Sequence, residues 1–236
     1  MNGFYDIGAP GFRNMLHVII ADDHPVVLRG LEDIIREGFD NVVVEKSSRG
    51  YELLNKINNG DFDIALFDIA LPDIHGLEVL KEIKQKKRIP VLVLSVYPEE
   101  NYATRALRAG ASGFLTKQST PDEILQAIRT VLSGKKYVSP VFAEKIVHDF
   151  AVDSERLPHE SLSDRELQIL SMIGTGKAMK EIAADLHLST NTVRTYRARI
   201  LDKIGVKGTN KLIHYAITHN IADNSYAQSD IRNSPV

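Results

Sequence analysis

The sequence predicts an α/β fold, in which a five-stranded, doubly wound parallel sheet is followed by a smaller all-α domain. Two patterns support this prediction. Short apolar runs alternate with amphipathic, helix-like segments through the first half of the chain, and after Gly134 only helical patterns continue. The length is a third observation, because 236 residues are long for one ordinary domain and sufficient for two cores.

Each repeat of the first half contains one strand candidate and one helix candidate. The strand candidates are Leu16–Ala21, Val42–Glu45, Ile64–Phe67, Val91–Ser95 and Gly113–Thr116. The helix candidates are Val26–Glu37, Gly50–Asn58, Gly76–Gln85, Glu99–Ala109 and Pro121–Ser133. Strands joined through helices lie parallel, because a parallel connection needs a long crossover. The first domain is therefore expected to cover residues 15–134.

The remaining segments differ in character. Residues 135–160 predict an interdomain linker with a short helix near Val141–Phe150, and residues 161–221 predict a second domain of four short helices. Residues 1–14 show no periodic pattern and are interpreted as an N-terminal extension. Residues 222–236 are rich in Asn, Ser, Asp and Gln, so we expect a flexible tail there.

Composition and charge narrow the class of protein. The chain has no cysteine, which excludes disulfides, thiolate metal sites and a thiol nucleophile. It has no apolar stretch long enough to span a bilayer and no secretory signal, so we expect a cytoplasmic protein with no membrane partner. Residues 161–221 carry 9 Lys and Arg against 5 Asp and Glu, although the whole chain has a net charge of -2. This excess hints at a polyanionic partner, but it is also common on solvated helices.

Three carboxylates lie at the ends of strand candidates. Asp22 and Asp23 follow the first strand, and Asp68 follows the third. A single acid in such a place is usually a turn or helix-cap residue, but the ends of these two strands are neighbours where open α/β sheets bind ligands. Together the acids predict a Mg²⁺ site. A carboxylate beside it can attack phosphorus, with Lys117 as the neighbouring cation and Ser95 as a hydroxyl for a phosphoryl oxygen.

Several segments, in order, resemble the receiver domain of two-component response regulators. They are Ala21-Asp22-Asp23-His24-Pro25, Phe67-Asp68-Ile69-Ala70-Leu71-Pro72 with Gly76-Leu77, Ser95, and Gly110-Ala111-Ser112-Gly113-Phe114-Leu115-Thr116-Lys117. The resemblance runs from about residue 16 to 132. It implies that Asp68 is the phosphoacceptor, that Asp22 and Asp23 are Mg²⁺ acids, and that Ala70 offers the ion its backbone carbonyl. His24 is left outside this predicted site.

The same resemblance implies a switch. Lys117 would contact the phosphoryl group, and Ser95 and Phe114 would form the pair of residues that moves after phosphorylation. Phe114 departs from the tyrosine that is frequent in the family, which puts a hydroxyl-dependent switch in doubt but leaves a ring rotation in place.

The third helix of the second domain has an apolar and a polar side. Ser189 or Thr190 is expected to cap it, and the residues on or beside its mainly apolar face are Val193, Tyr196, Arg197, Ile200 and Ile204. The opposite side carries Asn191, Arg194, Thr195, Ala198 and Arg199. Arginines beside small and hydroxyl side chains suit the DNA major groove, where Arg reads guanine and a small side chain meets thymine. The alternative is a solvated helix with ordinary surface charge.

This second domain resembles the LuxR-type helix-turn-helix domain, and both domains together resemble the NarL/FixJ architecture. The resemblance covers about residues 160–219 and is carried by Leu162-Ser163-Asp164-Arg165-Glu166, Gly176-Lys177, Lys180-Glu181-Ile182-Ala183, Leu188-Ser189, Thr192-Val193-Arg194-Thr195, Arg197 and Lys203-Ile204-Gly205-Val206. It implies that Lys180, Thr192, Arg197 and Lys203 have DNA-backbone or packing roles. Tyr196, Ala178 and Met179 depart from the family pattern, which puts the phosphate contacts in doubt.

These resemblances imply a transcription regulator and not an enzyme. A sensor histidine kinase would phosphorylate Asp68 with Mg²⁺, and phosphorylation would control homodimerisation, release of the recognition helix, or both, at double-stranded promoter DNA. Two alternatives remain. One is a phosphorylation-independent regulator whose receiver only dimerises. The other is a phosphohydrolase with Asp68 as nucleophile, which would want a second acid at the position of Ala70.

Overall fold

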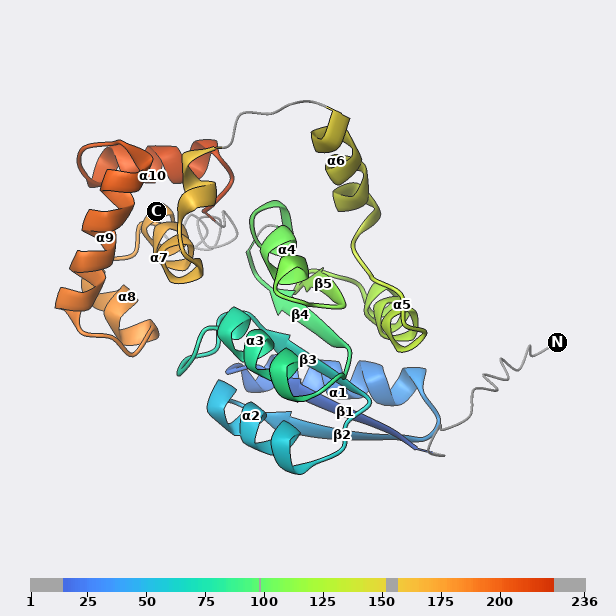
Figure 1. Ribbon diagram of the computed structural model, residues 1–236. Helices are drawn as coiled ribbons and strands as arrows, with labels where there is room; N and C mark the ends of the chain where they lie inside the picture. The colour runs from blue at the N-terminus through green and yellow to red at the C-terminus, as the bar shows by residue number, and fades with distance from the viewer. Residues whose placement is uncertain (1–14, 98, 152–156, 223–236) are drawn as a thin grey trace, which may run out of the picture.

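The first part of the chain forms a parallel five-stranded sheet, as predicted. The computed structural model describes residues 15–97, 99–151 and 157–222. The strands are β1 (Leu16–Ala21), β2 (Val42–Ser47), β3 (Ile64–Asp68), β4 (Val91–Ser95) and β5 (Gly113–Thr116), in the spatial order β2-β1-β3-β4-β5 (Figure 1). All four neighbouring pairs are parallel. Strand order reverses between β1 and β3, which places a ligand-binding crevice at their carboxyl ends.

Helices cover both faces of this sheet. They are α1 (Pro25–Gly38), α2 (Gly50–Asn59), α3 (Gly76–Lys86), α4 (Glu99–Arg108) and α5 (Pro121–Leu132). One apolar core joins α2, α3 and α4 to side chains such as Ile19 and Phe67, and a second core joins α1 and α5 to Ile20 and Leu66. Because side chains alternate across a strand, the near-continuous apolar runs bury both faces. The predicted doubly wound architecture is confirmed.

The second part of the chain is entirely helical among its described residues. It contains α6 (Pro140–Ala151), the 3-10 helix η1 (Pro158–Ser161), α7 (Asp164–Gly174), α8 (Met179–Asp185), α9 (Thr190–Ile204) and α10 (Thr209–Thr218). Ser163 caps α7 in a capping box with Glu166. Ser189 caps α9 by accepting the Thr192 N–H at 3.0 Å, and Gly205, with φ of 76°, ends that helix in the left-handed conformation.

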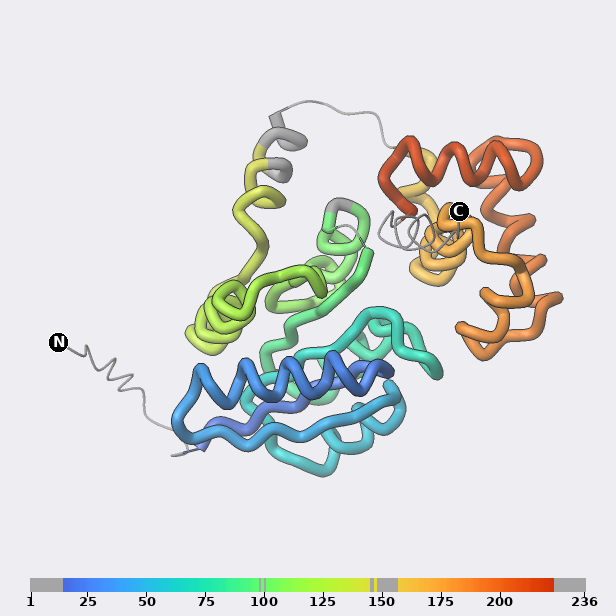
Figure 2. Tube along the Cα trace, turned by 180° about the vertical axis from the view of Figure 1, so that it is seen from behind, coloured from blue at the N-terminus to red at the C-terminus, as the bar shows by residue number. Residues whose placement is uncertain are grey.

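The two parts of the chain lie against each other. Arg105 of α4 contacts η1 and the first residue of α7, and Asn101 of α4 contacts Asn220 just after α10. In both views α6 stands apart from the other helices of this part (Figures 1 and 2). No helix of the described residues is long and apolar enough to cross a bilayer. The predicted N-terminal extension, part of the predicted linker and nearly all of the predicted tail lie outside the described residues.

Gly76, the first residue of α3, lies against the backbone that carries Asp68. A Cβ there would lie 2.6 Å from Ile69 Cα and 2.9 Å from the Asp68 carbonyl oxygen, and backbone cannot move aside as a flexible side chain can. We therefore expect Gly76→Ala to lower the free energy of unfolding in urea by about 3 kcal/mol. Gly30→Ala in α1 is the control, because a Cβ there meets nothing within 4 Å. It should add about 1 kcal/mol, and equal effects of the two changes would contradict the prediction.

Candidate functional site

Asp22 and Asp68 lie together at the carboxyl edge of the sheet and share one cation. Ala21 pairs with Phe67 in the β1–β3 register, so the acids that follow them are neighbours. Lys117, just after β5, places its Nζ 2.5 Å from Asp22 Oδ2 and 2.7 Å from Asp68 Oδ2. Both carboxylates are buried, with 0% of Asp22 and 2% of Asp68 exposed. The Lys117 ammonium therefore neutralises charge that burial would otherwise make costly.

Burial and charge act against each other at this cluster. Burial raises the pKa of Asp68, and the nearby Asp22 adds to the rise, while the Lys117 ammonium opposes it. Burial alone would lower the pKa of Lys117, but Asp68 and Asp22 outweigh it and raise that pKa above its ordinary value. Lys117 is therefore a permanent cation at neutral pH. Because this one cation is shared by two carboxylates, the cluster as a whole attracts further positive charge.

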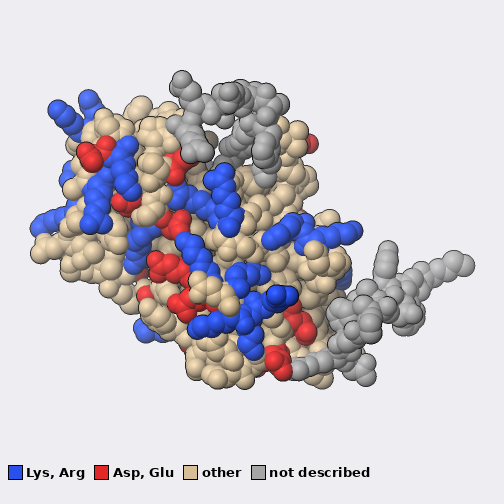
Figure 3. Space-filling view, viewed as in Figure 1, with Lys and Arg blue, Asp and Glu red and all other residues tan. Residues whose placement is uncertain are grey.

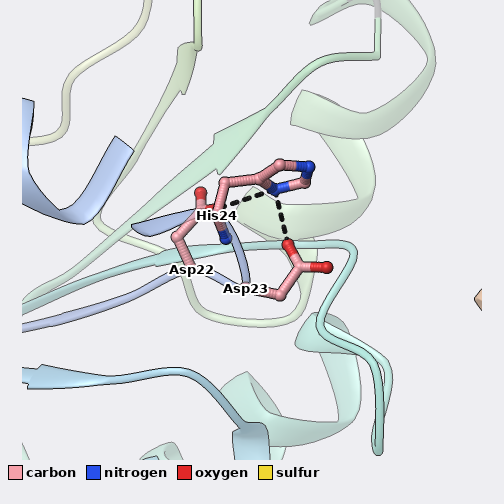
Figure 4. Close-up of side chains that lie close together, drawn as sticks. All are labelled: Asp22, Asp23 and His24. Atoms are coloured by element: carbon pink, nitrogen blue, oxygen red, sulfur yellow. Dashed lines mark hydrogen bonds and ion pairs between the residues drawn. The ribbon is translucent and has the colours of Figure 1, made fainter. Parts of the chain in front are cut away.

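Asp23 and His24 complete the edge of the cluster. Figure 4 shows the His24 ring turned toward both acids, with Nδ1 2.7 Å from Asp23 Oδ1 and 3.1 Å from Asp22 Oδ1. Asp22 Oδ1 also accepts the His24 backbone N–H at 2.9 Å. One ligand atom from each of the three residues lies within 4.8 Å of the others, an arrangement that fits a divalent cation. His24 was left outside the site predicted from the sequence, and its ring lies beside both acids.

The other predicted residues of this edge have defined positions. Asp68 Oδ1 accepts the Ala70 backbone N–H at 3.1 Å. Ser95, fully buried at the end of β4, accepts the Tyr97 N–H on its Oγ at 2.9 Å, and its carbonyl accepts the Lys117 N–H at 2.8 Å. Phe114 is fully buried in β5. The structure thus brings the acids, the lysine and the hydroxyl to adjacent strand ends.

His75 is a buried titratable group on the loop between Asp68 and α3. It caps α3 by accepting the Leu77 N–H on Nδ1, while Nε2 is buried without a hydrogen-bond partner among the described residues. Burial lowers the pKa of His75 to about 4, an effect opposed by Asp164 and supported by the nearby cations Arg165, Lys81 and Arg105. The side chain is therefore neutral in the folded protein at neutral pH.

This shift predicts an acid-dependent loss of stability. Between pH 6.5 and about 4 the unfolded chain binds a proton at His75 that the folded chain rejects, so the free energy of unfolding falls as pH falls through this range. His75 accounts for about 3 kcal/mol of this fall in the free energy of unfolding. His75→Asn keeps a capping acceptor and does not titrate, so its unfolding free energy, measured in urea, should depend less steeply on pH. Parallel pH curves for the parent and the variant would contradict this account.

The predicted DNA-reading side of α9 is accessible. Its outward residues Asn191, Arg194, Thr195, Ala198 and Arg199 are all exposed, and Val193, Ile200 and Ile204 are buried on the other side. Lys and Arg side chains gather over the region that carries α8 and α9 (Figure 3). A helix that is held by its apolar face and presents arginines can enter a major groove.

The four residues with predicted backbone or packing roles divide into two pairs. Arg197 donates from Nε and Nη2 to Thr209 Oγ1 at 3.0 and 2.7 Å, which ties α9 to α10. Lys203 Nζ lies 2.6 Å from Glu166 Oε2, which ties α9 to α7. Lys180 is exposed and Thr192 half-buried near the starts of α8 and α9. Arg197 and Lys203 thus contact neighbouring helices.

An open cavity of about 490 Å³ lies beside α9, the helix that is predicted to read DNA and is called the reading helix below. It is lined by Ile173, Gly176, Lys177, Ala178, Met179, Arg194, Arg197, Thr209 and Ile213. Sequence reasoning gave no role to Thr209, because it is a single hydroxyl at the start of α10 and only the fold brings it to Arg197. The basic lining suits a phosphate group of a polyanion.

Comparisons with known proteins agree with a sheet domain followed by a helical domain. A family model for the response regulator receiver domain matches residues 18–129, and one for bacterial regulatory proteins of the luxR family matches residues 160–216. The response regulator UvrY of Escherichia coli (strain K12) is 33% identical over 211 residues, which cover 89% of this chain and 97% of that protein. The response regulator GacA of Pseudomonas protegens is 34% identical over 212 residues, with 89% and 100% covered.

A solved structure also matches across both parts of the chain. It is RcsB from Salmonella enterica serovar Typhimurium bound to the promoter rprA in the presence of the phosphomimetic BeF3-, with 26% identity, a TM-score of 0.59 and coverage of 85% of this chain and 98% of that one. The relatives are response regulators, which speaks against the phosphohydrolase alternative. The chain belongs to the NarL/FixJ family of two-component response regulators, in which a receiver domain precedes a LuxR-type DNA-binding domain.

Proposed function

We propose that Asp68 accepts a phosphoryl group from a cognate sensor histidine kinase. The supporting observation is the Lys117 ammonium, which lies 2.7 Å from Asp68 Oδ2 at the strand edge. An Asp68 oxygen forms the new bond to phosphorus as the bond from phosphorus to the kinase histidine nitrogen breaks. Lys117 holds the phosphoryl oxygens by charge, and Ser95 offers them its hydroxyl.

Asp22, Asp23 and Asp68, with the backbone carbonyl of Ala70, would hold Mg²⁺ in this proposal. Carboxylate and carbonyl oxygens are the ligands that this ion prefers, and when bound it neutralises charge on the phosphoryl oxygens. The close approach of Asp22, Asp23 and His24 supports a cation at this edge. Ser95 and Phe114 form the proposed switch, because both are buried, Ser95 at the end of β4 and Phe114 in β5, the strand that Lys117 directly follows.

The output of this regulator is proposed to be binding of double-stranded promoter DNA by a homodimer. Asn191, Arg194, Thr195, Ala198 and Arg199 would face the base edges, and Lys180 and Thr192 the DNA backbone. Arg197 and Lys203 would act by holding α9 against its neighbours, as their contacts with Thr209 and Glu166 indicate. A twofold dimer favours paired half-sites.

One observation favours a second candidate, a regulator whose DNA binding does not depend on phosphorylation. The outward residues of α9 are exposed even though the helical part lies against α3 and α4. Access of DNA to this helix therefore does not require the two parts to separate.

Genome-wide mapping of bound sites separates the two candidates. Strains would carry the parent, Asp68→Asn, or Asp33→Asn, in which an exposed acid of α1 is changed. The proposal expects site occupancy to fall with Asp68→Asn and to be unchanged with Asp33→Asn. Equal occupancy in all three strains would support the phosphorylation-independent regulator instead.

A further inference from the structure

His24 occupies the N-cap position of α1, but its side chain does not cap the helix. The backbone is extended there, and the imidazole makes no capping hydrogen bond. The His24 carbonyl accepts the N–H groups of Val27 and Leu28 at 3.0 and 3.2 Å, so the backbone of this residue begins the helix. Pro25 follows at the start of α1, where its missing N–H costs nothing. The His24 ring is therefore not needed to hold α1.

The ring instead faces two carboxylate oxygens. Nδ1 lies 2.7 Å from Asp23 Oδ1 and 3.1 Å from Asp22 Oδ1 (Figure 4). The other oxygen of Asp22, Oδ2, lies 2.5 Å from the Lys117 ammonium. The two oxygens of this buried carboxylate thus serve different partners. Oδ2 is engaged by the lysine, and Oδ1 is turned toward His24 and Asp23.

The imidazole nitrogen and the two oxygens are spaced as ligands of one ion. Neighbouring ligand atoms of an octahedral ion bound at about 2.1 Å lie about 3 Å apart, and both distances from Nδ1 are close to this value. The His24 side chain is 62% exposed and that of Asp23 is 37% exposed, so water can complete the shell. Three protein ligands with a remaining position for water are the arrangement of open zinc sites.

Formal charge at this edge favours a divalent cation. Asp22, Asp23 and Asp68 are three carboxylates, and the Lys117 ammonium is the cation that contacts two of them. The excess of negative charge lies on the side of Asp23, away from the lysine. Asp22 is fully buried, which strengthens its attraction for a cation at its Oδ1.

A nitrogen ligand changes which divalent ion such a site prefers. Mg²⁺ is bound through oxygen atoms and keeps several waters, whereas imidazole suits zinc, copper, nickel and iron. The acids of the proposed Mg²⁺ site offer oxygen alone. His24 adds to them the kind of atom that Mg²⁺ does not select and that Zn²⁺ does.

We propose that His24 is a nitrogen ligand which, with Asp22 and Asp23, makes this edge of the sheet bind a first-row transition cation such as Zn²⁺ in preference to Mg²⁺. The inference rests on the proposed function only for the place of the cation, and it does not require phosphoryl transfer to Asp68. The acids bring a divalent ion to the site, and His24 determines which one is held more tightly.

Nuclear magnetic resonance of the full-length protein with isotopically labelled histidine tests the ligand directly. The resonances of His24 are those that disappear in His24→Asn. Zn²⁺ should move the Nδ1 resonance of His24 to the range of metal-bound imidazole, because the two ring nitrogens are distinguishable and the ion binds one of them. Mg²⁺ should leave that resonance where it is. A His24 Nδ1 that does not respond to Zn²⁺ would overturn the proposal.

Calorimetric titration of His24→Asn tests the preference between ions. Asn is a favoured N-cap residue, so α1 should be retained. Loss of partners that only orient a ligand typically weakens metal binding 10- to 100-fold, so loss of the nitrogen itself should weaken Zn²⁺ binding by at least about 10-fold. Binding of Mg²⁺ should not weaken. His214→Asn, which changes an exposed histidine of α10, is the matched control and should alter neither affinity.

The competing use of the ring is a hydrogen bond to the two acids with no part in metal binding. An arriving ion would then have to displace the imidazole, and His24→Asn would bind Zn²⁺ as tightly as the parent or more tightly. That result would contradict a ligand role for His24. Equal weakening of Zn²⁺ and Mg²⁺ binding would contradict the preference between them.

Asp23→Asn distinguishes this inference from the proposed Mg²⁺ site. It removes an oxygen ligand that both ions would use, so binding of Zn²⁺ and of Mg²⁺ should weaken together. If Mg²⁺ binding were unchanged in Asp23→Asn, the proposed Mg²⁺ site would be wrong. The response of the His24 ring to Zn²⁺ and the titration of His24→Asn would still decide the role of His24.

Discussion

Asp68→Asn is expected to abolish uptake of a phosphoryl group from acetyl phosphate. An amide oxygen is a poor nucleophile, and the change also removes one negative charge from the group that Lys117 contacts. The effect should be all or none, because among the described residues Asp68 is the carboxylate that ends β3 and shares Lys117 with Asp22. Intact-protein mass spectrometry after incubation with acetyl phosphate and Mg²⁺ measures the modified fraction.

Asp33→Asn provides the matched control for this experiment. It makes the same chemical change on an exposed residue of α1, and its modified fraction should equal that of the parent. If Asp68→Asn took up as much phosphoryl group as the parent, the assignment of Asp68 as the phosphoacceptor would be wrong. A peptide map of the parent that located the phosphoryl group on another residue would do the same.

Much of the first domain could be predicted because its sequence alternates clearly between apolar strand-like runs and amphipathic helix-like segments. Apolar runs such as Ile64–Phe67 and Val91–Ser95 are buried on both faces, so nearly every residue reports the strand. The end of β2 was harder to place. The sequence predicted an end at Glu45, whereas the strand continues to Ser47 through the exposed Glu45 and Lys46. This edge strand faces solvent where it carries those charges, so its apolar pattern ends before its hydrogen bonds do.

The contacts between distant segments could not be predicted. Arg105 meets carbonyls more than 50 residues away, and a backbone carbonyl leaves no mark in the sequence. Arg197 and Lys203 resembled DNA-contacting cations, but only the fold shows that Thr209 and Glu166 already engage them. In each case the missing information was which side chains the fold brings together, and periodicity does not carry it.

The second large effect is expected at the reading helix. Arg194→Ala should weaken binding to a target operator by about 10- to 100-fold, because a bidentate contact between arginine and guanine is worth about 1–3 kcal/mol of discrimination. Arg194 is exposed, and its one described hydrogen bond, from Nη1 to Asn191 Oδ1, is long at 3.4 Å. Its loss should therefore leave the fold and the free energy of unfolding nearly unchanged. Fluorescence anisotropy with an operator taken from the occupancy map measures the affinity.

The specificity of that loss distinguishes base reading from simple charge. If Arg194 contacts a base edge, Arg194→Ala lowers affinity for the operator much more than for a scrambled duplex, and the ratio of the two affinities falls. If it contacts only phosphate, both affinities fall together and the salt dependence becomes less steep. Arg108→Ala removes the same charge from the receiver and should change neither affinity. Unchanged operator binding by Arg194→Ala would remove this residue from the proposed interface, and equal losses on both duplexes would reassign it to the DNA backbone.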